Sequence, residues 1–515
     1  MDNSSRRRGR SLPQNLLNLL AFGDIKSHLY LQGGSLLGQG GPSGVSPLSA
    51  WGILDRVYSE VAFHRAPGKA AFFGEGRSVV LLYNFLLLAS LPVLGLVFTY
   101  QAIIRGKWRR GFFQRLGFFS LPPSSQKALW VHAVSVGEVH AATHLAKALK
   151  ERFPCFRLVI STTTETGQEA ARRRIPEADS LIYFPLDLPF SVAKVVQAVD
   201  PRLVVLMETE IWPNFLFHLR RRQIPLLIAN CRISPRSYRG YRRLRPFMRR
   251  ILASVSRFSV QTEDDAERLR RLGAPADRVR VTGNLKFDEA LHSVLSSPSL
   301  PEAIRESLGF PPQSPLWVAG SVHPGEEEVI LGAFSSLRDR HPELSLVLAP
   351  RRLNRVPEIE AMLQGRGLDY RLRSVLGPPN GRVLVLDTLG ELASLYGAAT
   401  VAFVGGSLVP WGGQNPLEPA ARGVPVLFGS HMQNFQEAAT LLKALGEGGT
   451  PAALEVAGPL QGAGGKLVKA VGRLLEDPGL ARAMGEQGQK VVRAHAGALE
   501  RNLELIAEFL AGEGD

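Results

Sequence analysis

The side chains of this sequence that could carry chemistry stand directly after apolar runs. Glu138 follows the run 129–134 within the segment Ser135-Val136-Gly137-Glu138. An apolar run of this length predicts a buried strand, so Glu138 should open the following helix at the carboxyl edge of a sheet. A carboxylate there can be a simple helix N-terminal charge worth less than about 1 kcal/mol. It can also be a general base that faces a cleft.

Two further carboxylates follow the apolar run 203–207. Glu208 and Glu210 lie two positions apart at the expected strand end. Two carboxylates beside an apolar sheet are costly unless they bind a ligand or pair with a cation, for which Arg232 is a candidate. Arginines and aromatic residues then alternate through 236–250. This pattern suits phosphate groups beside an apolar ligand or membrane, and RNA would fit it as well.

In the second half of the chain, residues that suit an anion follow the run 316–320. Ser321 can cap a helix and receive a phosphate, and His323 can donate to an anionic oxygen. A capped helix with an acidic first turn at 326–328 is the structural alternative. Arg351 begins an arginine pair at the end of the next apolar run, which suits bidentate contact with phosphate.

The glycine-rich segment between the runs 399–404 and 425–428 predicts a nucleotide site. A short helix should begin among the Gly, Asn and Pro residues of 412–419. Backbone N–H groups and Glu418 would then point into a cleft at the carboxyl ends of the strands, with phosphate at the helix start and ribose at the carboxylate. A glycine-rich turn that closes the sheet is the alternative.

The alternation of apolar runs with helical stretches predicts an α/β protein with two doubly wound, Rossmann-like domains facing a cleft. We assign 121–300 to the N-terminal domain and 301–515 to the C-terminal domain, with a Ser- and Pro-rich linker within 284–315. The last helical stretch, 478–510, would follow the final strand. The expected strands are 129–134, 157–161, 181–184, 203–207, 226–229, 258–261, 279–282, 316–320, 344–348, 383–386, 399–404 and 425–428.

The N-terminal region predicts a membrane attachment. Residues 1–76 are rich in Gly, Ser and Pro without periodicity, which predicts a disordered segment or an upstream extension. Residues 79–104 contain no charged residue and could cross the roughly 30 Å hydrocarbon core. Basic and aromatic residues follow, which predicts an interfacial segment with the rest of the chain on the cytoplasmic side. We therefore assign 77–120 to a membrane helix, spanning or embedded, and its interfacial segment.

Composition limits the class of partner. The 515 residues, 45% of them hydrophobic, can form two or three domains. The formal net charge of +15 favours anionic partners: nucleic acid, phosphorylated small molecules or anionic lipid. Cys155 and Cys231 are the two cysteines, and their spacing predicts neither a zinc site nor a disulfide framework. Walker and Gly-x-Ser-x-Gly patterns are absent from the sequence.

Taken together, these motifs resemble the 3-deoxy-D-manno-octulosonic acid (Kdo) transferases of lipopolysaccharide assembly. The resemblance extends from Val79 to the C-terminus, so we expect the native start near Val79. Gln414 stands where the family commonly has His, and Cys231 where it often has Gly. The motifs that carry the resemblance are Ser135-Val136-Gly137-Glu138, Glu208-Thr209-Glu210-Ile211-Trp212-Pro213-Asn214, Gly320-Ser321-Val322-His323-Pro324-Gly325-Glu326-Glu327, Pro350-Arg351 and Gly412-Gly413-Gln414-Asn415-Pro416-Leu417-Glu418-Pro419.

The resemblance implies a GT-B fold and inverting transfer of Kdo from CMP-Kdo to the lipid A precursor, without a metal or another cofactor. Glu138 would be the general base, and Glu210 and Glu208 would orient it or the acceptor. Arg232 would hold an acceptor phosphate or the Kdo carboxylate. The other residues implied to bind substrate are Ser135 and Gly137 beside the base, Ser321 and His323 near the phosphate, and Pro350, Arg351, Gly390, Asn415 and Glu418 around CMP.

The expected partners are CMP-Kdo, the lipid A precursor and the lipid surface of the inner membrane, with the catalytic domains on the cytoplasmic face. Nucleic acid and metal ions are not expected as partners. Two alternatives stay open: another GT-B enzyme that uses a UDP-sugar, and a catalytically inactive, membrane-tethered binding protein.

Overall fold

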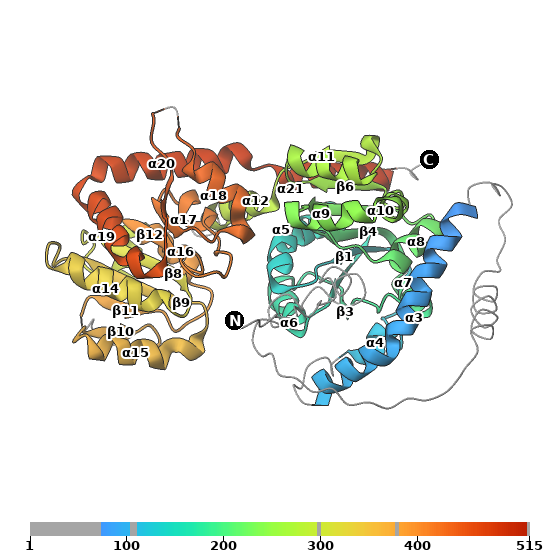
Figure 1. The fold of residues 1–515 in the computed structure, drawn as a ribbon, viewed down its shortest axis with the longest axis horizontal. Helices are drawn as coiled ribbons and strands as arrows, with labels where there is room; N and C mark the ends of the chain where they lie inside the picture. The colour runs from blue at the N-terminus through green and yellow to red at the C-terminus, as the bar shows by residue number, and fades with distance from the viewer. Residues whose placement is uncertain (1–73, 104–110, 296–299, 376–380, 447, 512–515) are drawn as a thin grey trace, which may run out of the picture. The chain divides into compact units, whose positions relative to one another are not determined.

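The computed structural model describes residues 74–103, 111–295, 300–375, 381–446 and 448–511. Residues 1–73 of the expected extension, the basic residues at 105–110 and the Ser-Pro stretch 296–299 lie outside the described part. The described residues form two compact α/β units (Figure 1). The first unit ends at Val279, and Thr143–Leu149 and Ser259–Glu263 group with the second unit.

The first unit is built on a seven-stranded sheet with the order β3-β2-β1-β4-β5-β6-β7. The pairs β1–β2, β1–β4, β2–β3 and β4–β5 are parallel. Because helices cover both faces of such a sheet, its strands are continuous apolar runs, as the sequence predicted. The strands are β1 (Ala128–His132), β2 (Arg157–Thr162), β3 (Ser180–Tyr183), β4 (Pro201–Met207), β5 (Leu226–Cys231), β6 (Arg257–Val260) and β7 (Val279–Val281).

Aromatic packing fills the centre of this unit. Trp130 of β1 is fully buried, and its ring meets Phe215 edge to face at 5.2 Å between centroids. The indole N–H of Trp130 donates to Ser161 Oγ at 2.8 Å, so its polar atom is satisfied. The helices of this unit are α3 (Gly74–Ile103), α4 (Phe112–Arg115), α5 (Val136–Arg152), α6 (Glu165–Arg174), α7 (Pro189–Val199), α8 (Pro213–Arg221), α9 (Pro235–Arg243), α10 (Arg245–Leu252), α11 (Glu263–Leu272) and the 3-10 turn η3 (Ala276–Arg278).

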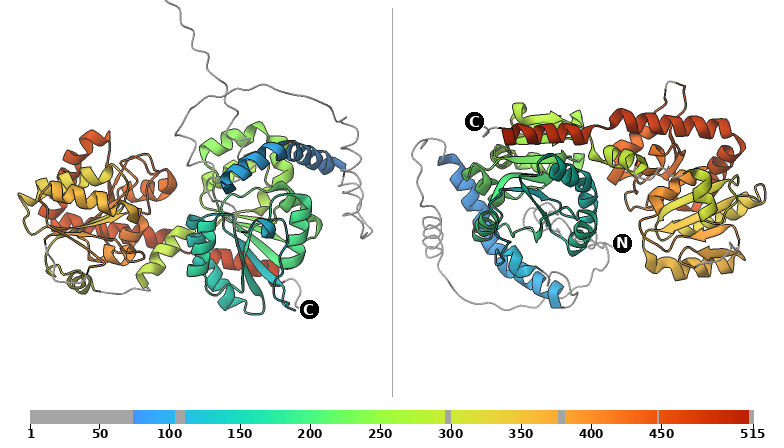
Figure 2. Two further views of the ribbon diagram at one scale, coloured as in Figure 1. Left: turned by 90° about the horizontal axis from the view of Figure 1, so that it is seen from below. Right: turned by 180° about the vertical axis from the view of Figure 1, so that it is seen from behind.

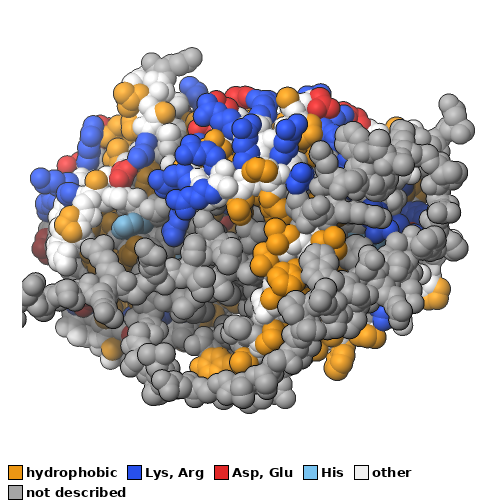
Figure 3. Space-filling model, turned by 45° about the vertical axis from the view of Figure 1, so that its right-hand side comes forward, with side chains coloured by type: hydrophobic (Ala, Val, Ile, Leu, Met, Phe, Trp, Pro, Cys, Tyr) orange, Lys and Arg blue, Asp and Glu red, His pale blue; other side chains and the backbone are white. Residues whose placement is uncertain are grey.

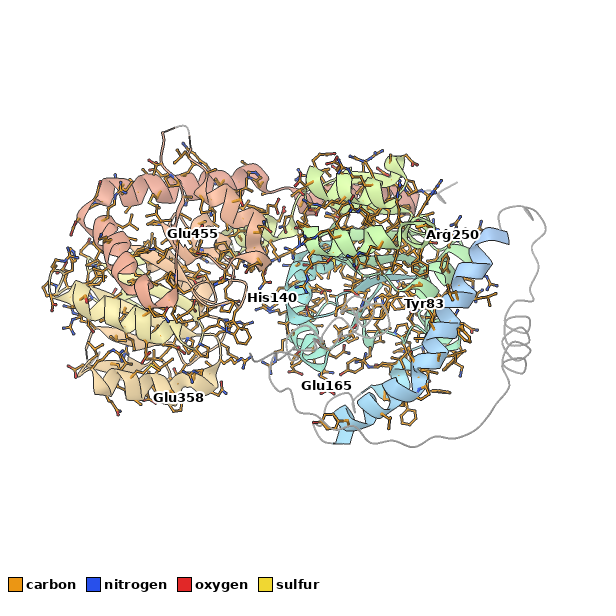
Figure 4. The ribbon with its side chains drawn as sticks, in the orientation of Figure 1. Tyr83, His140, Glu165, Arg250, Glu358 and Glu455 are labelled. Carbon is orange, nitrogen blue, oxygen red and sulfur yellow. The ribbon has the colours of Figure 1, made fainter. Side chains whose placement is uncertain are left out.

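Helix α3 packs along the first unit beside α8 (Figures 1 and 2). Its inward face includes Tyr83, whose place on the helix is labelled in Figure 4, together with Asn84 and Leu87. Tyr83 Oη donates to Asp187 Oδ2 at 2.9 Å. The side-chain amides of Asn84 and Asn214 bond each other twice, at 3.0 and 2.8 Å. Buried polar side chains with well-placed partners therefore attach this helix to the unit.

The predicted membrane-crossing helix over 79–104 is not confirmed. A helix does form there, but among the described residues no helix is long and apolar enough to span a membrane. The inward face of this helix buries Tyr83 and Asn84 against polar groups of the first unit.

The second unit contains another seven-stranded sheet, with the order β10-β11-β9-β8-β12-β13-β14. Neighbouring strands of this sheet pair in parallel. One core cluster centres on Trp317, Phe334 and Phe403, all fully buried. The strands are β8 (Leu316–Val322), β9 (Ser345–Pro350), β10 (Tyr370–Leu372), β11 (Val383–Val385), β12 (Val401–Val404), β13 (Val426–Gly429) and β14 (Ala453–Val456).

The second unit also differs from the sequence-based expectation. Strands β10 and β14, at the two edges of the sheet, were not predicted. The predicted helical stretch 478–510 is two helices, α20 and α21, separated at Gly497, whose φ is 95°. The helices are α12 (Leu285–Leu295), α13 (Pro301–Ser307), α14 (Glu326–Arg338), α15 (Val356–Gly365), α16 (Leu392–Leu395), α17 (Leu417–Ala421), α18 (Gln436–Lys443), α19 (Leu460–Glu476), α20 (Pro478–His495), α21 (Ala498–Leu510) and the 3-10 turns η4 (Leu353–Arg355), η5 (Tyr396–Ala398) and η6 (Gln433–Phe435).

Candidate active site

Near the centre of each sheet the strand order reverses. In the first sheet β1 lies between β2 and β4, and in the second β8 lies between β9 and β12. Parallel α/β sheets bind ligands outside the carboxyl ends of their strands at such reversals. The candidate residues of the first unit follow β1, β4 and β5, and those of the second follow β8, β9, β11 and β12. Each set therefore gathers at the carboxyl edge of its own sheet.

Glu138 lies in the first turn of α5, where two donors hold its carboxylate. The backbone N–H of Val134 donates to Oε2 at 2.6 Å, and the hydroxyl of Ser135 lies 3.4 Å from Oε1. Burial raises the pKa of Glu138 well above its usual range, and the charges of Glu208 and Glu210 raise it further. A carboxylate that is held in place and binds a proton tightly has the properties of a general base near neutral pH.

The position before Glu138 is open. Gly137 is exposed, and a Cβ atom placed on it would meet no atom of the described residues within 4 Å beyond its chain neighbours and its own helix. Glycine is therefore not required here by packing within the chain. The absence of a side chain leaves room for a ligand to approach the carboxylate.

The turns after β4 and β5 are joined by one hydroxyl. Thr209 donates its hydroxyl hydrogen to the carbonyl of Arg232 and accepts the backbone N–H of Arg232 at 3.2 Å. The preceding Glu208 has a φ of 57°, in the left-handed region that residues other than glycine seldom adopt. Such backbone strain is commonly found at functional sites. The predicted residues Glu208, Glu210 and Arg232 are all half-buried in these two turns.

Both cysteines are free thiols, and they differ in their environment. Cys231, at the end of β5, is fully buried, and burial raises its pKa to about 12. Its Sγ lies 3.5 Å from Thr209 Oγ1, so it packs inside the joined turns. Cys155 is exposed and precedes β2, at the opposite edge of the sheet from Glu138.

At the end of β8, His323 is enclosed by side chains of the site. Its ring stacks on Trp411 at 5.1 Å, and its Nε2 lies 3.2 Å from Gln414 Nε2. The guanidinium of Arg352 lies 5.8 Å from the centre of the Trp411 ring. Burial, followed by the charges of Arg351 and Arg352, lowers the pKa of His323 to about 4. The ring is therefore neutral at pH 7.

The turn after β12 is held by the buried carboxylate of Glu326. Its Oε2 accepts the backbone N–H groups of His323 at 2.8 Å and Gly406 at 2.7 Å. Its Oε1 accepts those of Ser407 at 2.9 Å and Leu408 at 2.8 Å. Burial raises the pKa of Glu326, and the four N–H groups act in the opposite direction.

Other N–H groups of the glycine-rich segment are also bonded within the chain. Gly413 N–H donates to Gly406 O at 2.8 Å, and Gln414 N–H donates to Gly405 O at 3.1 Å. Leu417 N–H, at the start of the short helix α17, donates to Asn415 Oδ1 at 3.1 Å. These three N–H groups therefore have partners within the chain, and the predicted phosphate contact of this segment stays a prediction for its other N–H groups.

The predicted nucleotide residues lie along the carboxyl edge of the second sheet. Asn415 Nδ2 donates to Glu418 Oε1 at 3.3 Å, which orients the half-buried carboxylate. Pro350 ends β9, and the N–H of Arg351 donates to Val322 O at 2.8 Å, so the exposed arginine follows directly beside β8.

Two further predicted residues at this edge have unusual backbone angles. Gly390 is exposed with a φ of 93°, which favours glycine. Apart from its chain neighbours, a Cβ placed on Gly390 would meet no described atom within 4 Å, so space is open there too. Ser321 has a φ of 53°, a second strained residue at a strand end. Among the residues that the structure describes, no group of His, Cys, Asp and Glu side chains could hold a metal ion.

Comparison with known proteins identifies the family. The model of the 3-deoxy-D-manno-octulosonic-acid transferase family (kdotransferase) matches residues 110–289. The 3-deoxy-D-manno-octulosonic acid transferase of Haemophilus influenzae is 34% identical over 440 residues, which cover 83% of this chain and 98% of that protein. The chain belongs to the Kdo transferase family. The predicted family and the predicted glycosyltransferase activity are thereby confirmed.

Two further similarities agree with this Kdo transferase assignment and with the fold. The 3-deoxy-D-manno-octulosonic acid transferase of Bordetella pertussis is 35% identical over 394 residues, covering 74% of this chain and 87% of that protein. The crystal structure of a UDP-GlcNAc 2-epimerase from Neisseria meningitidis bound to UDP-GlcNAc aligns with a TM-score of 0.52. The alignment covers 75% of this chain and all of the epimerase. At 15% identity it supports the fold alone, which is two Rossmann-like domains.

Three residues of this Kdo transferase site were not assigned roles from the sequence. Thr209 joins two turns, Glu326 holds the turn after β12, and Trp411 packs on His323. Thr209 lies inside a motif that was already noted and Trp411 directly precedes one, so their position was a usable signal. Glu326 is one of three consecutive glutamates, and the sequence offered no means of separating it from its neighbours.

Proposed function

We propose that this Kdo transferase moves Kdo from CMP-Kdo to a hydroxyl group of the lipid A precursor in lipopolysaccharide assembly, with inversion at the anomeric carbon. The observation that carries the proposal is the state of Glu138. Its carboxylate is fixed by Val134 and Ser135, its pKa is raised, and open space adjoins it at Gly137. An acid–base group near neutral pH is what deprotonation of a sugar hydroxyl requires.

In the proposed reaction Glu138 takes the proton of the acceptor hydroxyl while the hydroxyl oxygen bonds to the anomeric carbon of Kdo. The bond from that carbon to the CMP phosphate breaks, and CMP leaves with the electron pair. Attack on the face opposite CMP inverts the configuration, by the same geometry that a base follows in inverting glycosidases. Glu208 and Glu210 support this step because their charges raise the proton affinity of Glu138.

We propose that the second unit binds CMP through the carboxyl edge of its sheet, in a GT-B arrangement of the two domains. Asn415 orients Glu418 for the ribose hydroxyls. Arg351, at the end of β9 with Pro350, is placed to meet the phosphate, and the open backbone at Gly390 leaves room for the nucleotide. Negative charge that develops on the departing CMP is then stabilised by arginine instead of a metal ion.

On the acceptor side we propose that Arg232 binds a phosphate of the lipid A precursor or the Kdo carboxylate. Its backbone is fixed to the turn after β4 by Thr209, which directly precedes Glu210. A guanidinium on a fixed turn suits bidentate contact with either anion. The strained Glu208 directly precedes Thr209, and the hydroxyl of Ser135 contacts Glu138.

We further propose that the enzyme attaches to the inner membrane through α3, with its catalytic units on the cytoplasmic face. The outward face of this helix carries large apolar side chains that are 43% to 60% exposed, namely Leu82, Phe85, Leu86 and Leu88. Helices α9 and α10 add exposed arginines: Arg236, Arg239, Arg242, Arg243, Arg245 and Arg249. Figure 3 shows Lys and Arg side chains gathered beside a band of hydrophobic side chains. Such a surface suits an interfacial helix on anionic lipid.

The proposed reaction is tested by incubating the full-length protein with CMP-Kdo and a lipid A precursor, followed by mass spectrometry of the lipid. We expect a mass increase by whole Kdo units, which Glu138→Ala abolishes while CMP binding persists. Unchanged turnover in Glu138→Ala would exclude this residue as the base. Tighter binding of UDP than of CMP would refute the donor assignment in favour of a UDP-sugar enzyme. Wild-type protein that binds CMP but transfers nothing would support the binding-protein alternative.

A further inference from the structure

Glu326 makes contacts that a helix N-terminal carboxylate does not usually make. It is the first residue of α14 and is fully buried. A carboxylate at this position normally serves the N–H groups of its own helix start. Three of the four N–H groups that Glu326 accepts belong instead to Gly406, Ser407 and Leu408, more than 75 residues away in the sequence.

The neighbouring glutamate already serves the local role. Glu327 Oε2 accepts the N–H of Gly325 at 2.8 Å, and its Oε1 lies 3.3 Å from Nε of Arg355. Glu328 is exposed at the same turn. A simple cap of α14 therefore does not account for Glu326, whose oxygens link the end of β8 to the turn after β12.

This link adjoins side chains of the candidate donor site. Gly405 approaches Ser321 so closely that a Cβ on it would lie 2.4 Å from Ser321 O. A Cβ on Gly406 would lie 3.0 Å from Cδ2 of His323, so the two turns touch. The segment that follows this turn contains Gln414, whose side-chain Nε2 lies 3.2 Å from Nε2 of His323.

We propose that Glu326 is a positioning residue for the donor: its carboxylate holds the turn after β12 against the end of β8 and so fixes His323 and Gln414 where the phosphate of CMP-Kdo binds. The proposal rests on the proposed function. The negative charge also occupies N–H groups that would otherwise attract a phosphate. The donor phosphate must then bind to side chains such as Arg351, which sets its position relative to the acceptor.

The test compares Glu326→Gln with Glu328→Gln, a matched control in the same helical turn. Glutamine has the same shape, but its NH2 group faces backbone N–H donors and cannot accept from them. We expect Glu326→Gln to weaken CMP binding, measured by calorimetry without acceptor, by roughly tenfold, the loss of one charge-assisted hydrogen bond. The KM for CMP-Kdo should rise in parallel, and the control should match the wild type.

A second comparison separates positioning from a general loss of folding. Glu326→Asp keeps the charge with a shorter reach, so CMP binding should fall less than in Glu326→Gln. In a double-mutant cycle with His323→Ala, the effects on CMP affinity should be less than additive, because Glu326 acts through His323. Additive effects, or an Asp variant as weak as the Gln variant, would overturn the proposal.

The outcomes also distinguish this inference from the proposed function. A lower fraction of active protein with unchanged KM and CMP affinity would show a structural role only and would overturn the inference. Wild-type protein that binds CMP but transfers no Kdo would refute the proposed reaction, while the CMP titrations of the variants would still decide the role of Glu326. Wild-type protein that binds no CMP would overturn both.

Discussion

Replacing Tyr83 with Phe removes one hydroxyl from the polar contact between α3 and the first unit. This hydroxyl donates to Asp187 at 2.9 Å, and Asp187 also accepts the N–H groups of Asn214 and Phe215 at 3.1 and 2.9 Å. Burial raises the pKa of Asp187 from 3.8 to about 6, and the three donors oppose this rise. Tyr83→Phe should therefore destabilise the protein by an amount that depends on pH.

The magnitude follows from the charge of Asp187. The folded protein binds the Asp187 proton more tightly than the unfolded chain does, so this group makes the fold less stable as pH rises from about 4 to above 6. Above that range Tyr83 donates to an ionised carboxylate, a bond worth about 1.5–3 kcal/mol, against about 0.5–1.5 kcal/mol for a neutral pair. Loss of the hydroxyl should then raise the pKa of Asp187 by about one more unit. We expect a destabilisation of about 1 kcal/mol at pH 5 and about 2–3 kcal/mol at pH 8.

Urea unfolding at pH 5 and pH 8 measures the change in the free energy of unfolding. Hydrogen exchange of the Asn214 and Phe215 amides measures the loss of stability at the contact itself. Leu86→Ala, on the exposed face of the same helix, is the control and should change neither measurement. An equal destabilisation at both pH values would refute the role assigned to the Asp187 charge. Unchanged exchange at Asn214 would show that the hydroxyl does not hold α3.

Three other predictions concern the site. Glu210→Gln removes a charge that raises the pKa of Glu138, so the acid limb of the kcat/KM profile should move to lower pH; an unmoved limb would contradict the coupling. Glu418→Ala should weaken CMP binding by roughly tenfold in calorimetry, and an unchanged affinity would remove this residue from the ribose site. Arg352→Gln should raise the pKa of His323 above its value of about 4 in an NMR titration, because a neighbouring positive charge is lost; a constant pKa would leave burial and Arg351 as its causes.

The two sheets could be predicted because their central strands are buried on both faces and read as unbroken apolar runs. The missed strands are short edge strands. In β10, Tyr370–Leu372, the middle residue is arginine, and in β14, Ala453–Val456, Glu455 is exposed. Such edge strands form backbone hydrogen bonds with one neighbouring strand only. Their sequences therefore show little of the pattern that predicts a strand.

The contacts that shape the site depend on residues far apart in the chain. The apolar run of α3 predicts burial, but whether it meets lipid or protein depends on Asp187 and Asn214, more than 100 residues later. Likewise, the acidic residues after β8 predict the start of a helix. Tertiary packing determines that Glu326, among these residues, binds the turn after β12. Residue types at strand ends were predictable, and their partners were not.

The two cysteines give this enzyme a natural attachment point for a spectroscopic probe. Cys231 is enclosed in the joined turns of the site with its pKa raised to about 12, so it has almost no reactive thiolate at pH 7. Cys155 is exposed and lies at the amino end of β2, away from every candidate residue of that sheet. A maleimide dye should therefore label the folded wild-type chain at one known position. With a second dye on CMP, energy transfer to this position could report nucleotide binding without any substitution.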